Sequence, residues 1–400
     1  MTAKKFVSII LCFIMAVTIY PSVYASGGAL STESKEVSGY AKIELPSFDV
    51  PCKNAVLISA DTGDVLYEKN PNEKVPIASI TKVMTLILTF DAINAGKIAY
   101  SDIVPISEHA FGMGGSQIWL EPGEQFTLDE LLKAICVSSA NDAAVAVAEY
   151  VGGSEGVFVD MMNKKAAELG MVNTSFKNAC GLDEDNHLSS AADVAIMSRK
   201  LLNYGEDITK YTTIWMDTLR EGATQLTNTN KLLKKYSGIN GLKTGTTGKA
   251  GVCISASAVR DDMGLIAVVL GATNSKDRFT AAMELLDYGF ANFEAIPFPN
   301  IADKCEILPV HMGAVKEVKL NYLIPNKILI KKGDSEKLKI TQTLPEFTQA
   351  PIVKNTQVGV VTVSVGEEKI SEYQILADGS VDKMSFNAGM LLLLNGLISL

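Results

Sequence analysis

The chain has 400 residues, of which 47% are hydrophobic and 20% charged, with 13 prolines and a formal net charge of -9 at pH 7. This length predicts two or three folded units, and the apolar fraction is typical of a globular protein rather than a disordered one. The acidic balance argues against nucleic acid as a partner, because neutralising phosphates needs clustered Lys and Arg side chains.

The first 25 residues have the pattern of a secretory signal peptide. Lys4 and Lys5 precede an apolar run from Phe6 to Tyr20, and Val23 to Ala25 offers residues that a cleavage site tolerates. A retained N-terminal membrane helix is the alternative, although the apolar run is shorter than the ~20 residues that a span needs. Both interpretations predict export. A polar, Ser- and Gly-rich arm is expected over residues 26–45.

Cysteines and histidines do not predict a disulfide framework or a metal site. The cysteines beyond the signal are odd in number and widely scattered, and only three histidines occur, without the clustering that zinc ligands show. We therefore expect no cofactor and no metal, and we expect these cysteines to be small buried apolar side chains. The two tryptophans, Trp119 and Trp215, are expected to pack internally rather than to stack on a substrate.

A catalytic unit of mixed helices and strands is predicted over residues 46–296. It opens with two strands, 55–60 and 65–67, around an Asp/Gly turn. Pro76 then precedes an apolar helix from about Ser79 to Ala95, whose first turn carries Ser79 and Lys82.

The middle of this unit predicts a helix, a break and a second helix between residues 127 and 151. Apolar residues recur at helical spacing until Ser138 to Asn141 interrupt them. Farther on, the apolar runs 252–259 and 265–271 read as an antiparallel hairpin, and a helix over 278–293 closes the unit.

Beyond Pro297 the composition changes to alternating β-type segments, which predict a second, all-β domain, a sandwich over residues 297–380. The expected strands are 317–322, 328–330, 338–341 and 357–365. Residues 384–400 are strongly apolar. Because 17 residues are marginal for a membrane span, an amphipathic anchor lying in the membrane surface is favoured, with a buried terminal element as the alternative.

Ser79 and Lys82 are candidates for a nucleophile and its base. A serine hydroxyl is a weak nucleophile at neutral pH, and a lysine can activate it when desolvation or nearby positive charge lowers the lysine pKa. Residues three apart share one helix face, and a helix N-terminus favours negative charge on the serine oxygen. The pattern S-x-x-K alone is weak, because Ser380 and Lys383 match it equally, followed by Ser385-Phe-Asn387.

The tripeptide Lys243-Thr244-Gly245 discriminates between these matches. It occurs once, against a chance expectation of roughly 0.1 in such a chain. A strand edge bearing Lys and Thr can present a cation and a hydroxyl to a substrate carboxylate, and Gly lets the ligand approach the backbone.

Taken in order, Ser79-Ile-Thr-Lys82, Ser139-Ala-Asn141 and Lys243-Thr-Gly245 resemble the serine acyl-transferase set of penicillin-binding proteins and class A β-lactamases. The resemblance covers about residues 40–380 and is closest to the low-molecular-mass D-alanyl-D-alanine carboxypeptidases of peptidase family S11. Further segments that look like theirs are Gly114-Gly-Ser-Gln117, Leu120-Glu-Pro-Gly123, Ala140-Asn-Asp-Ala143, Gly181-Leu-Asp183 followed by His187, and Thr227-Asn-Thr-Asn230.

This resemblance implies an α/β (α+β) fold, an antiparallel sheet flanked by helices, and a serine-type enzyme that removes terminal D-alanine from peptidoglycan stems and is acylated by β-lactams. Ser79 would form the acyl-enzyme, Lys82 would take its proton, and Ser139 would relay a proton to the leaving amine. Asn141 would orient Lys82 and bind the substrate amide.

The resemblance also implies how the substrate is held. Lys243, Thr244 and Arg278 would bind the terminal carboxylate, with Gly245 giving close approach. Backbone N–H groups of Ser79 and Thr246 would form the oxyanion hole. Relatives often carry His at the position of Thr246, which leaves substrate preference open. We interpret His187 as structural, because the lysine already supplies a base. The expected location is the outer face of the cytoplasmic membrane, with the C-terminal tail on the membrane surface.

Three alternatives remain. A class A β-lactamase would need a glutamate-activated water from an E-x-x-L-N signature, and the nearest string, Glu168 to Asn173, has the wrong spacing. A DD-endopeptidase acting on cross-links would perform the same chemistry. A non-catalytic penicillin-binding sensor or scaffold would need the catalytic side chains to be misplaced.

Overall fold

The structure is a computed structural model that describes residues 46, 48–301, 305–387 and 389–390. The predicted signal peptide, the 26–45 arm and residues 391–400 of the predicted anchor lie outside the described residues.

A five-stranded antiparallel sheet forms the centre of the catalytic domain, in the order β2-β1-β9-β8-β7. Its strands are β1 (Asn54–Ser59), β2 (Val65–Lys69), β7 (Ile239–Thr247), β8 (Gly251–Arg260) and β9 (Met263–Ala272). The predicted strand pair after the polar arm and the predicted β8–β9 hairpin are confirmed.

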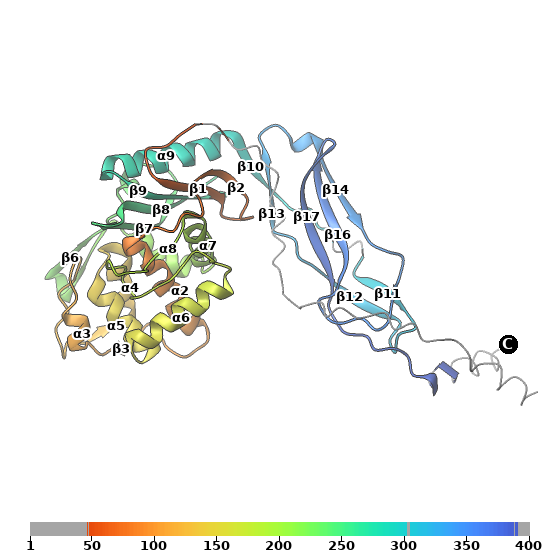
Figure 1. The fold of residues 1–400 in the computed structure, drawn as a ribbon, viewed down its shortest axis with the longest axis horizontal. Coiled ribbons are helices and arrows are strands. Elements are labelled where there is room, and N and C mark those ends of the chain that lie inside the picture. The colour runs from red at the N-terminus through yellow and green to blue at the C-terminus, as the bar shows by residue number, and fades with distance from the viewer. Residues whose placement is uncertain (1–45, 47, 302–304, 388, 391–400) are drawn as a thin grey trace, which may run out of the picture. The chain divides into compact units, whose positions relative to one another are not determined.

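Both faces of this sheet are buried, which explains its long apolar runs. Successive residues of one strand enter two different cores: Val56 and Ile58 face the helical layer, whereas Ala55 and Leu57 face helix α9 (Ser275–Asn292). Figure 1 shows α9 on one side of the sheet and the other helices on the opposite side.

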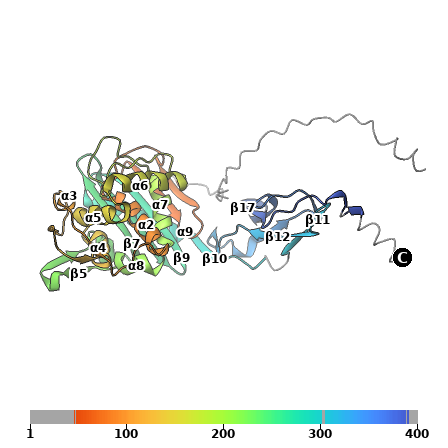
Figure 2. The same ribbon diagram turned by 90° about the horizontal axis from the view of Figure 1, so that it is seen from below.

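The helical layer surrounds α2 (Lys82–Asn94), whose first nine residues are buried. In Figure 2, which is seen from below, this layer faces the viewer. The predicted helix, break and helix are confirmed as α4 (Leu128–Val137) and α5 (Asn141–Gly152). The other elements of this domain are η1 (Ala78–Thr81), β3 (Ile103–Val104), α3 (Glu108–Phe111), β4 (Phe126–Thr127), α6 (Glu155–Glu168), α7 (Ala191–Leu202), α8 (Glu206–Thr212), β5 (Met216–Leu219), η2 (Arg220–Gly222), β6 (Thr224–Thr227) and η3 (Lys231–Lys234).

Trp119 corrects one expectation, because its side chain is 73% exposed rather than packed. Its neighbours Ile118 and Leu120 are buried, and Trp119 itself has a φ of 58°. The two neighbouring N–H groups both donate to the carboxylate of Asp142, and this arrangement turns the residue between them outward.

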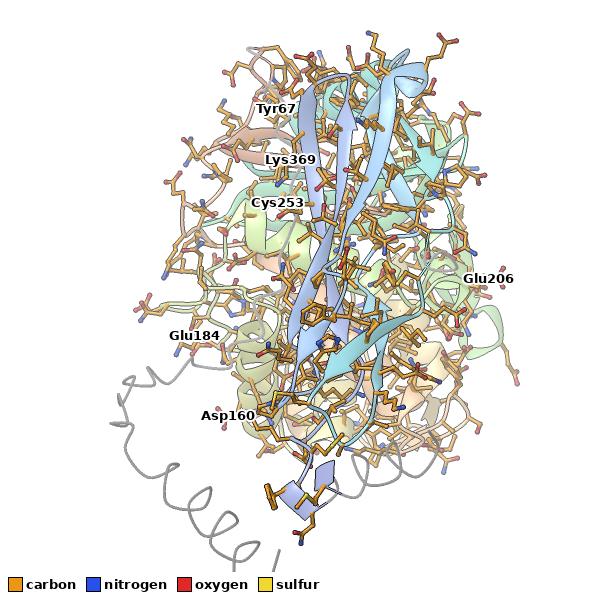
Figure 3. The ribbon with its side chains drawn as sticks, turned by 90° about the vertical axis from the view of Figure 1, so that its right-hand side faces the viewer. Tyr67, Asp160, Glu184, Glu206, Cys253 and Lys369 are labelled. Atoms are coloured by element: carbon orange, nitrogen blue, oxygen red, sulfur yellow. The ribbon has the colours of Figure 1, made fainter. Side chains whose placement is uncertain are left out.

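The C-terminal domain is all-β, as predicted. Its main sheet has six strands in the order β14-β16-β17-β12-β11-β15, and β10 pairs separately with β13. The strands are β10 (Phe293–Pro297), β11 (Ile307–His311), β12 (Glu317–Tyr322), β13 (Lys327–Lys331), β14 (Leu338–Thr343), β15 (Thr348–Gln349), β16 (Gln357–Val365) and β17 (Glu368–Ala377), with η5 (Ser335–Lys337) between β13 and β14. Lys369, labelled in Figure 3, lies in β17. The four strands predicted here correspond to β12, β13, β14 and β16.

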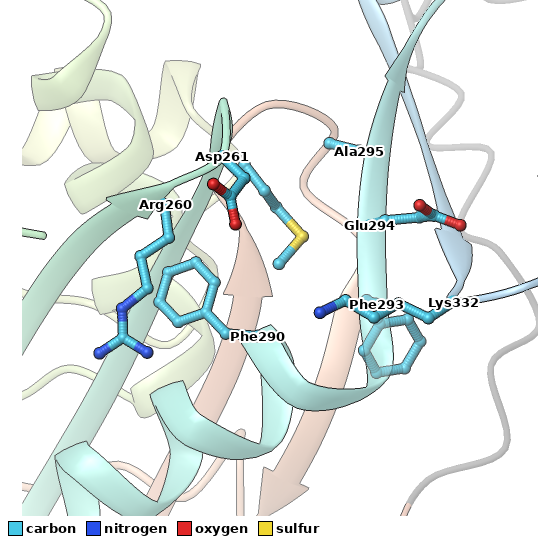
Figure 4. A pocket seen from close by; sticks show the side chains of 8 residues that line it. Arg260, Asp261, Phe290, Phe293, Glu294, Ala295 and Lys332 are labelled. Carbon is cyan, nitrogen blue, oxygen red and sulfur yellow. The ribbon is translucent and has the colours of Figure 1, made fainter.

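A cavity of about 420 Å³ lies beside the end of α9, and none of the predicted site residues lines it. Figure 4 shows its lining, which consists of Arg260, Asp261, Met263, Phe290, Phe293, Glu294, Ala295 and Lys332.

The described cysteines are free: Cys136, Cys180 and Cys253 are buried, and Cys52 and Cys305 are half-buried. In the described part of the chain, no group of His, Cys, Asp and Glu could hold a metal ion. Among the described helices, none is both long enough and apolar enough to cross a membrane.

Candidate active site

Ser79 lies in the 3-10 turn η1 that leads into α2, and Lys82 is the first residue of that helix. The prediction of an α-helical first turn at Ser79 is therefore wrong in detail. Ala78 has a φ of 49°, which separates this turn from a regular helix start. Because residues i and i+3 eclipse one another in a 3-10 turn, the two side chains meet directly. Lys82 Nζ lies 2.9 Å from Ser79 Oγ.

Three oxygens surround the Lys82 ammonium. Besides Ser79 Oγ, they are Asn141 Oδ1 at 2.6 Å and the Cys180 carbonyl at 2.7 Å. The Lys82 side chain is fully buried, and burial lowers its pKa from 10.5 to about 8, partly offset by Cys180 and Asp142. A lysine with this pKa is neutral often enough near neutral pH to accept a proton.

The loop that supplies the Cys180 carbonyl approaches η1 very closely. An ideal Cβ on Gly181 would stand 2.0 Å from the Ala78 carbonyl oxygen, and Gly181 has a φ of +85°. Only glycine fits both conditions. Thr85 Oγ1 donates to the Ala179 carbonyl at 2.6 Å and fixes the same loop to α2.

His187 also ties this loop to η1. Its Nδ1 accepts from the Lys177 N–H at 3.1 Å, which leaves Nε2 to donate to Thr81 Oγ1 at 2.8 Å. Burial lowers the pKa of His187 to about 4, so the neutral imidazole is the form present near neutral pH. These contacts agree with the structural role expected for it.

Asn141 begins α5 and is fixed from three directions. Its Oδ1 accepts from Lys82, its Nδ2 donates to the Gly114 carbonyl at 2.7 Å, and its backbone N–H donates to the Ser116 carbonyl at 2.7 Å. The next residue, Asp142, accepts from two N–H groups of the same 113–120 loop. The amide of Asn141 is thereby oriented with its oxygen toward Lys82.

Ser139 lies in the break between α4 and α5, as predicted. It is 4% exposed and has a φ of 63°, a conformation that non-glycine residues adopt rarely and that is found at functional sites. The Ala140 N–H donates back to the Ala134 carbonyl, which holds the break next to the end of α4.

Two of the predicted carboxylate-binding residues, Lys243 and Thr244, occupy β7, the edge strand of the sheet. Lys243 and Thr244 are 2% and 5% exposed, and Thr244 Oγ1 donates to Thr229 Oγ1 at 2.7 Å. Burial holds the pKa of Lys243 well below its usual range, and the positive charge of Lys82 lowers it further. A bound carboxylate would relieve both effects, because it supplies the missing negative charge.

Gly245 brings β7 against the nucleophile. An ideal Cβ at this position would lie 2.9 Å from the Ile77 carbonyl oxygen and 3.0 Å from the Ser79 nitrogen. The backbone of β7 thus runs beside that of η1, where the N–H groups of Ser79 and Thr246 are expected to hold an oxyanion. The Thr246 hydroxyl donates to the Gly245 carbonyl at 2.8 Å.

Arg278 reaches this strand from the first turn of α9. Its Nη1 donates to the Cys253 carbonyl at 3.2 Å and to the Gly245 carbonyl at 3.4 Å. Burial lowers the pKa of Arg278 to about 10. Within the described part of the chain, its buried Nε has no hydrogen-bond partner. The guanidinium therefore has hydrogen-bonding capacity that the described contacts do not use.

Two groups that contribute to this site were not recognised as site groups from the sequence. The Cys180 carbonyl is a backbone group, and no side-chain pattern marks a carbonyl that holds a lysine. Thr229 lies in the segment Thr227 to Asn230, which is part of the resemblance, but only the folded structure shows its hydrogen bond with Thr244. The second S-x-x-K match is set apart, because Ser380 lies in the β domain, where its Oγ accepts from the Lys354 N–H.

Chemically, the arrangement places a hydroxyl beside a desolvated amine and a cationic strand edge. The amine can remove the hydroxyl proton, and the strand can hold a terminal carboxylate near the attacked carbonyl. These features suit acyl transfer from a peptide that ends in a free carboxylate.

Comparisons with known proteins agree with this interpretation of the site. The family model described as D-alanyl-D-alanine carboxypeptidase matches residues 41–274, and the model described as penicillin-binding protein 5, C-terminal domain, matches residues 301–383. The chain is 43% identical over 387 residues to the D-alanyl-D-alanine carboxypeptidase DacF of Bacillus subtilis (strain 168), covering 96% of each chain. The chain belongs to the serine-type D-alanyl-D-alanine carboxypeptidase family.

Solved structures of this carboxypeptidase family and its relatives share the fold. Penicillin-binding protein 5 from Haemophilus influenzae superposes with a TM-score of 0.76 at 31% identity, covering 85% of this chain and 100% of that one. Penicillin-binding protein D2 from Listeria monocytogenes in its cefotaxime-bound form has a TM-score of 0.57 at 31% identity, covering 61% of this chain and 99% of that one.

The string closest to the class A β-lactamase signature begins at Glu168, and the contact of this glutamate is not with the predicted site residues. Glu168 ends α6, where its carboxylate pairs with Lys165 at 3.1 Å and is 48% exposed. This placement adds to the wrong spacing that already argued against a class A β-lactamase.

Proposed function

We propose that this chain removes the terminal D-alanine from peptidoglycan pentapeptide stems through an acyl-enzyme on Ser79. The observation that carries the proposal is the buried Lys82 amine, which bonds Ser79 Oγ and Asn141 Oδ1 at once and has a pKa lowered to about 8.

The proposed first step is attack of Ser79 Oγ on the carbonyl carbon of the penultimate D-alanine. Neutral Lys82 takes the hydroxyl proton as the new C–O bond forms, and the carbonyl oxygen becomes an oxyanion between the Ser79 and Thr246 N–H groups. When the C–N bond breaks, the leaving amine receives a proton through Ser139. Water then attacks the ester, giving the shortened stem and free Ser79.

Lys243, Thr244 and Arg278 would orient the substrate through its terminal carboxylate. Lys243 and Thr244 lie on β7, and the guanidinium of Arg278 donates a hydrogen bond to the Gly245 carbonyl of that strand. The carboxylate would compensate two buried cations, which makes recognition of a free C-terminus the favoured specificity.

Benzylpenicillin tests the nucleophile, because its strained amide mimics the D-Ala-D-Ala bond. Intact-mass spectrometry should show one covalent adduct on the unaltered chain and none on Ser79→Ala. Ser380→Ala is the matched control, since Ser380 has the same sequence pattern in the β domain, and it should keep the adduct. An adduct that survives Ser79→Ala, or a chain that never forms one, contradicts the mechanism. The second outcome would favour a non-catalytic scaffold.

Product assays separate the remaining activities. D-alanine release from a pentapeptide supports the carboxypeptidase, whereas rapid turnover of benzylpenicillin would indicate a β-lactamase. A DD-endopeptidase is a second candidate, because a D-alanyl-D-alanine endopeptidase of Pseudomonas aeruginosa is 32% identical over 58% of this chain. Cleavage of a cross-linked muropeptide dimer measures that activity directly.

We also propose that the protein is exported and held on the outer face of the cytoplasmic membrane by residues 384–400. The apolar composition of this segment supports the proposal. Removing residues 384–400 should move the protein from the membrane fraction to the soluble fraction. Continued sedimentation with membranes would refute the tether.

A further inference from the structure

The end of the β domain from which the C-terminal segment leaves exposes four large apolar side chains. Met312, Val315, Phe347 and Phe386 are 73%, 55%, 41% and 81% exposed, and we call them the distal patch. They come from three segments: the β11–β12 turn, the loop before β15 and the chain that follows β17.

Backbone hydrogen bonds hold the first and third of these segments together. The Met384 N–H donates to the Met312 carbonyl at 2.8 Å, and the Ala314 N–H donates to the Asp382 carbonyl at 2.8 Å. Gly313 and Lys383 form an antiparallel bridge between the same two segments. Figure 1 and Figure 2 both show the blue end of the described chain beside β11.

The second segment is fixed by ring stacking and strand pairing. The Phe347 ring lies parallel to that of His311, with centroids 3.8 Å apart and an interplanar angle of 10°. The β15 strand directly after it pairs with the end of β11. Phe347 is therefore held next to the turn that carries Met312.

The side chains of the distal patch lie outside the hydrophobic core of the β domain. Leu308, Val310, Val318 and Val381 fill that core beneath it and are at most 5% exposed. Met312 has a φ of 57°, which is unusual for an unbranched apolar residue in a turn and directs it away from the core strands. Apolar side chains that are rigidly held outside a filled core mark a contact surface.

The distal patch lies where the apolar C-terminal segment begins, and this position indicates the kind of partner that it contacts. Residue 384, which bonds the Met312 carbonyl, is also the first residue of the apolar C-terminal segment. Exposed charges of both signs surround the patch, including Lys316, Lys383, Asp382 and Glu346. Mixed charge gives little attraction to an anionic surface, so apolar contact must supply the affinity.

We propose that the distal patch inserts into a lipid membrane interface beside the C-terminal segment and forms a second membrane contact. This proposal rests on the membrane tether proposed above. It adds that the folded β domain itself touches lipid, in addition to the C-terminal segment.

Vesicle partition of the full chain measures the contribution of the patch. With vesicles of equal parts phosphatidylcholine and phosphatidylglycerol, Met312→Ser combined with Val315→Ser should lower the partition coefficient about tenfold. Val172→Ser is the matched control, because Val172 is an 81% exposed apolar residue of the catalytic domain. It should leave partition unchanged. The unaltered chain should still bind vesicles of phosphatidylcholine alone, and added salt should have little effect on its partition coefficient.

A fluorescence measurement reports contact rather than affinity. Phe347→Trp should give emission that brominated lipid quenches, whereas Val172→Trp should not respond. A benzylpenicillin adduct at the normal rate confirms that the catalytic domain of each variant is folded, and an unchanged circular dichroism spectrum confirms the same for the β domain.

The outcomes distinguish this proposal from the tether. If the full chain binds vesicles but the patch variants bind equally well and Phe347→Trp is not quenched, the tail alone anchors the protein and the patch proposal is overturned. If the unaltered chain binds no vesicles, both proposals fail.

Discussion

At the scale of single residues, the proposed mechanism makes the reactivity of Ser79 depend on the protonation of Lys82. The Lys82 pKa is lowered to about 8 because the side chain is buried. Only the neutral amine can accept the serine proton, so the reactive fraction of enzyme grows as pH rises toward this pKa and levels off above it.

We therefore expect the rate of acylation by benzylpenicillin to rise up to about tenfold per pH unit below about 8 and to flatten above it. Lys82→Arg keeps a positive charge that cannot be lost, and it should slow acylation roughly a thousandfold at every pH. Rapid-quench mass spectrometry measures both. Lys383→Arg, in the second S-x-x-K match, should behave like the unaltered chain. A pH profile that is flat across this range would show that Lys82 is not the base.

At the scale of elements, the site is a junction of one turn, one helix start and one strand. The η1 turn and β7 approach so closely that the strand must carry glycine at position 245, where a Cβ would meet the Ile77 carbonyl and the Ser79 nitrogen. The spacing of the N–H groups proposed to bind the oxyanion depends on this contact.

Gly245→Ala should push β7 away from η1 by a few tenths of an ångström or more and lower the acylation rate by about a hundredfold. Gly248→Ala is the matched control, because an ideal Cβ there meets nothing within 4 Å. Stopped-flow acylation with a chromogenic cephalosporin provides the rates. Equal rates for the two variants would mean that the strand can retreat without disturbing the oxyanion hole.

The sequence predicted the elements that have a strong local signature. Leu128 to Ile135 repeat with helical spacing, and the runs of β8 and β9 are apolar throughout because both faces of the sheet are buried. It placed Ser79 in an α-helix because Pro76 and the apolar run following it give no sign of a 3-10 turn. Ala78 has a positive φ where the Gly181 loop and β7 both approach it closely, and such tertiary contacts cannot be predicted from the local sequence pattern.

Among site residues, side chains in ordered motifs could be predicted, whereas backbone partners could not. Ser79, Lys82 and Asn141 meet as expected. The Cys180 carbonyl came from a segment 98 residues away, and its identity carries no chemical signal. Trp119 was misjudged because tryptophan is usually well buried, whereas here the carboxylate of Asp142 organises the backbone on both sides of it.

At the scale of the whole molecule, most hydrophobic clusters of the described residues belong to one domain each. The two larger cores include residues of the catalytic domain such as Leu86 and Leu285, with Leu329 of β13 joining the second, and the β domain has its own smaller clusters around Val310, Ile375 and Val363. Units with separate cores commonly unfold in separate steps.

Calorimetry should therefore show two unfolding transitions. Benzylpenicillin should raise the midpoint of the catalytic transition by a few degrees, because its carboxylate compensates the buried charges of Lys243 and Arg278, and it should leave the other transition in place. Ser79→Ala should abolish the covalent shift. A single transition that moves as a whole would show that the two domains unfold as one unit.

The three bonds to Lys82 have one more consequence, which concerns the order of events during folding. Its partners stand 3, 59 and 98 residues away along the chain. Because loop-closure entropy opposes the two long-range contacts, we expect them to form late in folding. An unfolded chain would thus not react with β-lactams, and the drug would acylate only molecules that have finished folding. Adding penicillin at different times during refolding would then measure the fraction of chains that have reached the folded state.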